Sequence, residues 1–225
     1  MLLDSCFIVE LFLQHEEGLD SKWPFYGDLN TLVADLLKIG NQMPFSVLED
    51  LYRWFCKHGN QVTDLKMMAL NFCNHALVGP SDMSYPDRLQ QQPKHLLDLF
   101  RSSLLFPSTP YKSNCKGFPS SIQRAQLLCK AGISLRRKRK AKSLLAIDFR
   151  KLRIPPFSLR IPPIPIDDLT SAILVHCVTL EQCLINTCKH FTAYILFMNC
   201  LMRQPEDVEF LRVANIITGI HPLNS

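Results

Sequence analysis

The segment ISLRRKRKAKSLLAIDFRK, residues 133–151, decides how the chain is organised, because the helical spacing of apolar residues stops there. Leu145, Ile147 and Phe149 occur at every second position, which is the period of a half-buried strand. A shorter alternating run begins at residue 133, before the basic residues. Two strand-like runs on either side of a charged connector predict a β-hairpin whose tip is the basic run, residues 136–142.

The next segment, LRIPPFSLRIPPIPIDD at residues 152–168, contains five prolines and repeats the tripeptide IPP. Proline has no backbone N–H to donate, so it is confined to sheet edges, bulges and the first residue of a strand. We therefore expect this segment to be an extended proline-rich strap on the surface rather than a central strand.

The sequence on both sides of this region has apolar residues at helical spacing. We expect one partial domain with four parts: a helical part at 1–106, a flexible loop at 107–121, a helix with the hairpin and strap at 122–166, and a second helical part at 167–220. Asp167 or Asp168 is expected to cap the helix that follows the strap, and Pro205 to occupy a helical first turn. The predicted fold class is mainly α, with a small β-hairpin and a proline-rich strap.

The composition is that of a globular chain, with 47% hydrophobic residues and a net charge of +5. Removing the six cations of the basic run leaves 19 basic residues against 20 acidic ones, so the positive charge is local. A membrane-spanning helix needs about 20 apolar residues. The longest such run, FTAYILFMNCL at 191–201, is shorter and contains Thr192 and Asn199, so we expect it to be a buried helix.

The sequence contains none of the motifs for nucleophilic serine, phosphate-binding, dinucleotide-binding or zinc-protease sites. Its nine cysteines include no CxxC pair, and the Cys and His residues between 176 and 190 do not have the spacing of zinc ligands. We therefore predict no enzymatic activity, no metal and no cofactor, with a thiol-dependent enzyme as a remaining hypothesis. The polar pairs Asn41-Gln42 and Glu181-Gln182 are predicted to bind neighbouring backbone groups.

Eight segments occur in one order along the chain: MLLDSCFIVELF, LLKIGNQMPFSVLEDLY, HLLDLFR, CKAGISL, LAIDFRK, LRIPP, IDDLTSAILVHCVTLEQC and MNCLMRQPEDVEFL. This series, which covers residues 1 to about 217, resembles the plant family called domain of unknown function 247. The resemblance implies a largely helical land-plant protein and implies no enzymatic activity. Some members of the family are associated with self-incompatibility in grasses, which suggests recognition of a protein partner at a membrane.

The resemblance also implies a longer protein, because family members carry a further N-terminal part and usually one transmembrane helix near the C-terminus. By this comparison the chain is expected to be the middle of such a protein. Full-length relatives are expected at the plasma membrane or another membrane, and a chain without the anchor in the cytoplasm or the nucleus.

The basic run Arg136, Arg137, Lys138, Arg139, Lys140 and Lys142 is the candidate interaction or targeting site. Its interpretations are a solvated loop whose charge keeps a sheet edge from pairing with other chains, a nuclear import signal, or a contact with an anionic membrane. Nucleic acid is disfavoured because no aromatic residues interleave the charges. We expect a non-enzymatic protein–protein recognition or scaffold module with an unknown protein partner. The alternative is a nuclear or nucleic-acid-associated protein.

Overall fold

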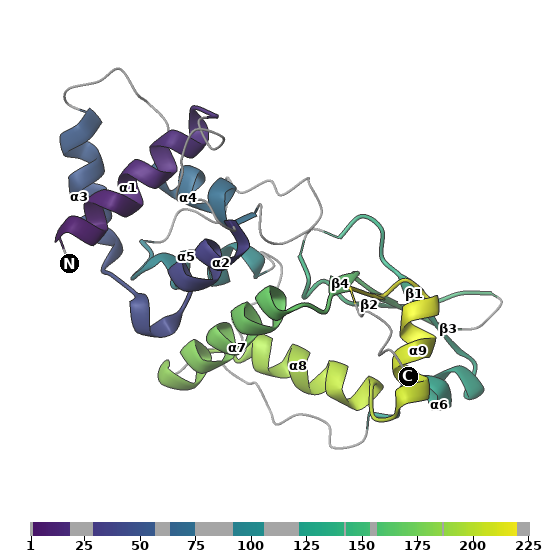
Figure 1. Ribbon diagram of the computed structural model, residues 1–225. Helices are drawn as coiled ribbons and strands as arrows, with labels where there is room; N and C mark the ends of the chain where they lie inside the picture. The colour runs from purple at the N-terminus through teal and green to yellow at the C-terminus, as the bar shows by residue number, and fades with distance from the viewer. Residues whose placement is uncertain are drawn as a thin grey trace.

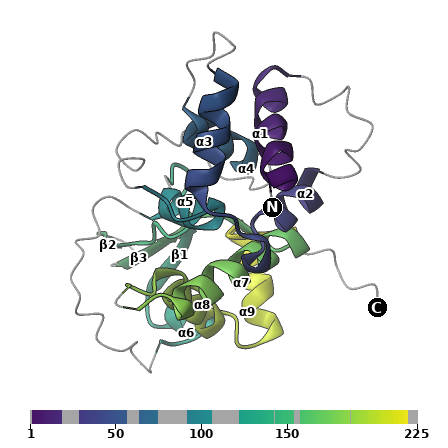
Figure 2. The same cartoon turned by 90° about the vertical axis from the view of Figure 1, so that its left-hand side faces the viewer.

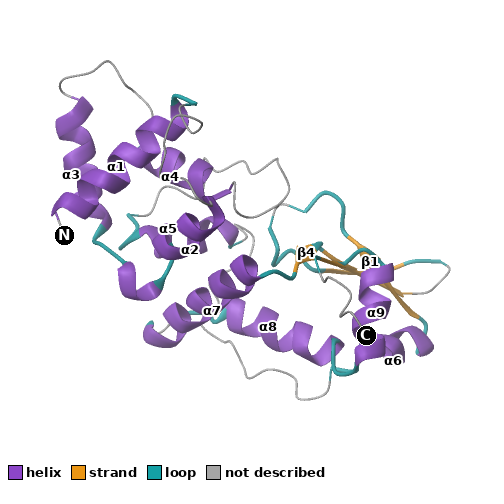
Figure 3. Cartoon of the chain, viewed as in Figure 1, coloured by secondary structure: helices purple, strands orange, loops and turns teal. Residues whose placement is uncertain are grey.

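The structure, a computed structural model, describes residues 2–18, 29–56, 64–74, 92–105, 122–141, 143–153, 157–185 and 187–219. The predicted flexible loop at 107–121 and Lys142 lie outside these residues. The helices are α1 (Leu2–Glu16), α2 (Leu29–Leu36), the short 3-10 helix η2 (Ile39–Asn41), α3 (Phe45–Cys56), α4 (Leu65–Asn74), α5 (Leu96–Leu104), α6 (Ala125–Lys130), α7 (Asp168–Cys183), α8 (His190–Leu201) and α9 (Pro205–Val213). The strands are β1 (Ile133–Arg137), β2 (Asp148–Lys151), β3 (Phe157–Ile161), β4 (Ile164–Pro165) and β5 (Ile217–Thr218). The fold is mainly α, as predicted (Figure 1, Figure 3).

The first hydrophobic core is built by α1 to α5 together with α7. Phe12, Phe45, Phe72 and Phe100, each from a different helix, are fully buried in it. Burying an aromatic side chain of this size contributes about 2–3 kcal/mol. Helix α7 packs against α2 and α5, so the helix after the strap returns to the helices that precede the sheet.

The second core lies between the three-stranded sheet and α6, α8 and α9. Leu159 and Ile161 of β3 are buried there with Leu201 of α8 and Leu211 of α9. Figure 2 shows α1, α3 and α4 at one end of the molecule and the sheet, α6, α8 and α9 at the other. Helix α8 reaches both cores, because its first turn contributes Phe191 to the first one.

The predicted β-hairpin is wrong, because β1 and β2 do not pair with each other. The strand order is β1-β3-β2, with β3 parallel to β1 and antiparallel to β2. The central strand therefore comes from the proline-rich segment. The pentapeptide FSLRI contains no proline, so every residue of β3 keeps its backbone N–H, and its buried Leu159 and Ile161 favour the central position over an exposed one.

The predicted surface strap is wrong for the same reason, since the prolines flank β3 instead of excluding it. Pro162 and Pro163 follow the strand directly, and β4 then pairs in parallel with β5. The N–H groups of Ile164 and Ile166 donate to Ile216 O and Thr218 O at 2.9 and 2.8 Å. Alternate residues of a strand donate to one neighbour, so the missing N–H of Pro165 removes no hydrogen bond from this ladder.

The predicted local signals are confirmed. The Asp167 carboxylate accepts from Thr170 N at 2.7 Å and caps α7, and Pro205 occupies the first turn of α9. Gln42 accepts from Leu97 N at 2.8 Å and donates to Leu36 O at 2.8 Å, so it fixes the turn between core helices. Over the ranges given above, no helix combines the length and the apolar composition needed to cross a membrane.

Candidate functional site

Four cations of the basic run are exposed on the end of the sheet. Arg136 and Arg137 are the last two residues of β1, and Arg139 and Lys140 lie in the turn that follows. Within the described part of the chain none of the four makes an ion pair. Their charges are therefore available to a partner.

Lys138, by contrast, points inward and holds the turn against the sheet. Its Nζ lies 3.0 Å from the Asp148 carboxylate and donates to Ala146 O at 2.8 Å. Its backbone N–H donates to Ile161 O at 2.8 Å, and the neighbouring Ala141 is buried. The pKa of the Asp148 carboxyl lies below its usual value, mainly because the Lys138 side chain donates a hydrogen bond to it. Residues 138–141 thus form a turn held against the sheet rather than a loose loop.

Strand β2 forms an exposed edge next to this turn. Phe149, Arg150 and Lys151 are all exposed, and Phe149 is 60% accessible to solvent. The Phe149 ring stacks on Phe157 of β3, with 5.5 Å between the ring centroids. In the described residues β2 pairs with β3 alone, so no described strand pairs with its other side.

The strand register sets the charge of the sheet surface. It places Arg136, Arg160 and Asp148 in one row across β1, β3 and β2. The single carboxylate of this row is already engaged by Lys138 and, at 3.5 Å, by Arg150. We define the basic edge as the exposed residues Arg139, Lys140, Arg150 and Lys151, which lie on β2 and in the turn that Lys138 ties to its first residue. Arg136 and Arg137 lie on β1, which is separated from β2 by β3.

A buried ion pair joins α5, α7 and α8. Arg101 Nη2 lies 2.9 Å from Glu181 Oε1 and also donates to Cys188 O at 3.2 Å, and both charged side chains are at least 95% buried. Glu181 further accepts from Phe191 N at 3.1 Å and from Thr192 N and Oγ1, each at 3.0 Å. The expected bonding of Glu181 to neighbouring backbone is therefore confirmed, and its carboxylate neutralises the N-terminal end of α8.

Arg101 was not identified from the sequence. It lies four residues after Leu97 and three before Leu104, so it shares the apolar face of α5. This position on the apolar face was the sequence feature that could have indicated a buried arginine. The partner Glu181 is 80 residues away, and no local pattern connects the two.

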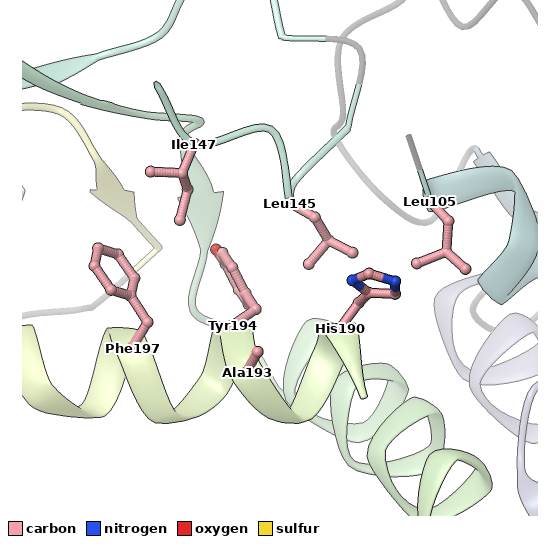
Figure 4. A pocket seen from close by; sticks show the side chains of 7 residues that line it. All are labelled: Leu105, Leu145, Ile147, His190, Ala193, Tyr194 and Phe197. Carbon is pink, nitrogen blue, oxygen red and sulfur yellow. The ribbon is translucent and has the colours of Figure 1, made fainter. Parts of the chain in front are cut away.

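A pocket of about 250 Å³ lies between α8 and the segment that leads into β2. The described residues that line it are Leu105, Leu145, Ile147, His190, Ala193, Tyr194 and Phe197 (Figure 4). Burial lowers the pKa of the His190 imidazole and raises that of the Tyr194 hydroxyl, so both groups are neutral at neutral pH. No sequence motif marked this pocket.

Metal centres and reactive thiols are the remaining kinds of candidate site. The described residues contain no cluster of three or more His, Cys, Asp or Glu residues that could hold a metal ion. Burial raises the pKa of the Cys73 and Cys177 thiols to about 12, which leaves both protonated at neutral pH. These two cysteines are therefore poor nucleophiles.

Comparison with known proteins identifies the family. The family model described as "Plant protein of unknown function", DUF247, matches residues 1–224, so the chain belongs to this plant family. The UPF0481 protein At3g47200 of Arabidopsis thaliana is 30% identical over 251 aligned positions, covering 98% of this chain and 50% of the relative. The chain thus spans about half the length of this curated relative. No solved structure matches the chain.

Proposed function

We propose that this family member is a non-enzymatic recognition module that binds an extended acidic segment of a protein partner along β2 and the basic edge. The observation that carries the proposal is the exposure of Phe149, Arg150 and Lys151 on an edge strand. In this proposal the partner segment adds to the sheet as a further strand.

The edge supplies the three kinds of contact that such a segment needs. The open side of β2 offers main-chain hydrogen bonds. Side chains alternate along a strand, so Phe149 and Lys151 lie on one face of the sheet and Arg150 on the other. The Phe149 ring provides an apolar contact backed by Phe157, while the two cations attract carboxylates.

The turn that follows β1 extends this surface. Because Lys138 is bonded to Asp148, the first residue of β2, Arg139 and Lys140 are held near the point where β2 begins. A segment lying along β2 can therefore reach their charges without a change in the turn. The same charges repel a second copy of this chain, which leaves the edge selective for acidic partners.

A protein partner is favoured over the other two candidates. An anionic lipid leaflet attracts the cations but offers no main chain to pair with β2. A nuclear import signal at 136–142 is disfavoured because Arg136 and Arg137 are held in β1 by pairing with β3. The family resemblance implies recognition of a protein partner at a membrane, which agrees with a protein partner, and we extend this to the chain as part of the proposal.

The test measures the anisotropy of a fluorescein-labelled short peptide of alternating glutamate and threonine. One variant carries Gln at Arg139, Lys140, Arg150 and Lys151. The matched control carries Gln at four other exposed cations, Lys38, Lys94, Lys189 and Arg203. Both variants have a net charge of +1 instead of +5, so they differ only in where the charge is lost.

We expect the Kd of the first variant to rise by about tenfold or more, and the control to bind like the unchanged chain. The Phe149→Ser variant should also bind more weakly, because it loses the apolar contact. Equal weakening in both four-residue variants would reduce the effect to net charge and reject the site. Tighter binding to vesicles of anionic lipid or to duplex DNA than to the peptide would assign the surface to a membrane or to nucleic acid, against the proposal.

A further inference from the structure

The pocket beside α8 contains a polar group that the protein leaves unsatisfied. Tyr194 is 95% buried, since only 5% of the residue is accessible to solvent. Its hydroxyl has no hydrogen-bond partner among the described residues. Figure 4 shows the side chain rising from α8 between Ile147 and Leu145, with the hydroxyl end turned toward the 145–147 segment. A buried hydroxyl without a partner costs free energy unless a bound molecule satisfies it.

The rest of the lining excludes a charged ligand. Five of the seven lining residues have apolar side chains, and the sixth, His190, is held neutral by burial. The nearest buried charges, Arg101 and Glu181, are bonded to each other. A carboxylate or an ammonium group in this pocket would therefore remain without a counter-charge.

The volume sets the size of the ligand. A protein cavity of about 150 Å³ accommodates benzene, so about 250 Å³ suits a molecule of about ten non-hydrogen atoms. We propose that this pocket binds a small, uncharged, mainly apolar molecule, such as a bicyclic or substituted aromatic compound, through one hydroxyl or carbonyl oxygen that pairs with the Tyr194 hydroxyl. This inference is independent of the acidic-segment proposal, because the two sites share no lining residue.

The experiment compares 1-naphthol with naphthalene, which differ by one hydroxyl group, by fluorescence titration of the full chain. The chain should bind 1-naphthol saturably at one site, about three- to tenfold more tightly than naphthalene, which is the usual value of one neutral hydrogen bond. The Tyr194→Phe variant should keep binding both compounds and lose the preference. The anion 1-naphthoate should bind much more weakly than either.

A second pair of variants locates the binding. Ala193→Leu places a larger side chain in the pocket and should abolish saturable binding. Ala34→Leu makes the same change at another half-buried helix position, outside the pocket, and should bind like the unchanged chain. Thermal unfolding of each variant checks that it is folded.

Three results would overturn the inference. The first is non-saturable binding of 1-naphthol, which would mean that the pocket holds water alone. The second is an unchanged preference for 1-naphthol in Tyr194→Phe. The third is equal binding by Ala193→Leu and Ala34→Leu, which would place the compound elsewhere on the chain.

Discussion

The buried pair Arg101–Glu181 is expected to be the polar contact on which the stability of the fold depends most. It connects α5 with α7 and, through the hydrogen bonds of Glu181 to Phe191 and Thr192, with the first turn of α8. The Glu181→Gln variant tests this expectation because glutamine has almost the same shape and no charge. Any loss of stability then reports the charge and the hydrogen bonds rather than packing.

The magnitude follows from the contacts that change. Glutamine Oε1 can still accept from Arg101 and from Phe191 N. Its amide nitrogen, however, would face the two donors of Thr192, and Arg101 would remain buried without a counter-charge. Removing one partner of a buried ion pair costs about 3–5 kcal/mol. Because whole domains are stable by only about 5–15 kcal/mol, this is a large part of the total.

The measurement is urea unfolding followed by circular dichroism. With a denaturant slope of about 2 kcal/mol per molar, the Glu181→Gln midpoint should fall by about 2 M. The Arg101→Met variant should lose less, because Glu181 keeps its three donors from α8. The double variant should lose less than the sum of the two single ones, since neither charge is left alone.

An exposed pair provides the control. Glu209→Gln removes an ion pair of 2.8 Å with Arg212 on the surface of α9, and it should leave the midpoint nearly unchanged. A drop of less than about 1 kcal/mol for Glu181→Gln would refute the reasoning. Simple additivity of the Glu181 and Arg101 variants would also refute it.

Three further predictions concern single side chains. Asp167→Ala should lower the free energy of unfolding by about 1 kcal/mol because the cap of α7 is lost, and Asp168→Ala, one residue further on, should cost less. His95 accepts from Asp98 N as the cap of α5, and burial lowers its pKa from 6.5, so stability should be complete above about pH 6.5 and decline as the pH falls below it. In urea unfolding at pH 7.5 and pH 5.5, His95→Asn, which keeps the acceptor, should show a smaller decline. Tyr194→Phe should raise the free energy of unfolding by up to about 1 kcal/mol, since it removes an unsatisfied buried hydroxyl; a lower melting temperature would contradict this.

The helices were predictable because their signals are local. Asp167 caps α7, and Pro205 begins α9, as spacing and composition indicated. The same holds for Gln42, whose hydrogen bonds reach α2 and the start of α5 from a turn that the sequence marked. The two helix starts depend on residues within one turn, and the turn at Gln42 was marked locally although its bond to Leu97 joins residues 55 positions apart.

The sheet could not be predicted in the same way, because its pairing joins segments far apart in the sequence. Proline content was assessed over residues 152–168 as a whole, which hid the proline-free strand at 157–161. Two alternating runs separated by charges suggested a hairpin, although the strands β1 and β2 lie on either side of β3 and do not pair with each other. The central position of β3 depends on the packing of Leu159 and Ile161 against α8 and α9, which no local pattern contains.

The candidate sites were predictable only in part. The basic run was recognised from its composition, but Arg136 and Arg137 belong to β1 rather than to the connector between strands. The inward direction of Lys138 depends on Asp148, ten residues away, and the exposed edge depends on the strand order. The pocket combines α8 with the 145–147 segment, so it exists only in the folded chain.

Amide hydrogen exchange at β2 tests the proposed recognition most directly. Exchange is measured over residues 148–151 with and without a saturating amount of the glutamate–threonine peptide. If the peptide adds as a strand, exchange in this range should slow, and exchange in α6 (Ala125–Lys130) should not change. Peptide binding that leaves the β2 amides unprotected would contradict strand addition at the basic edge.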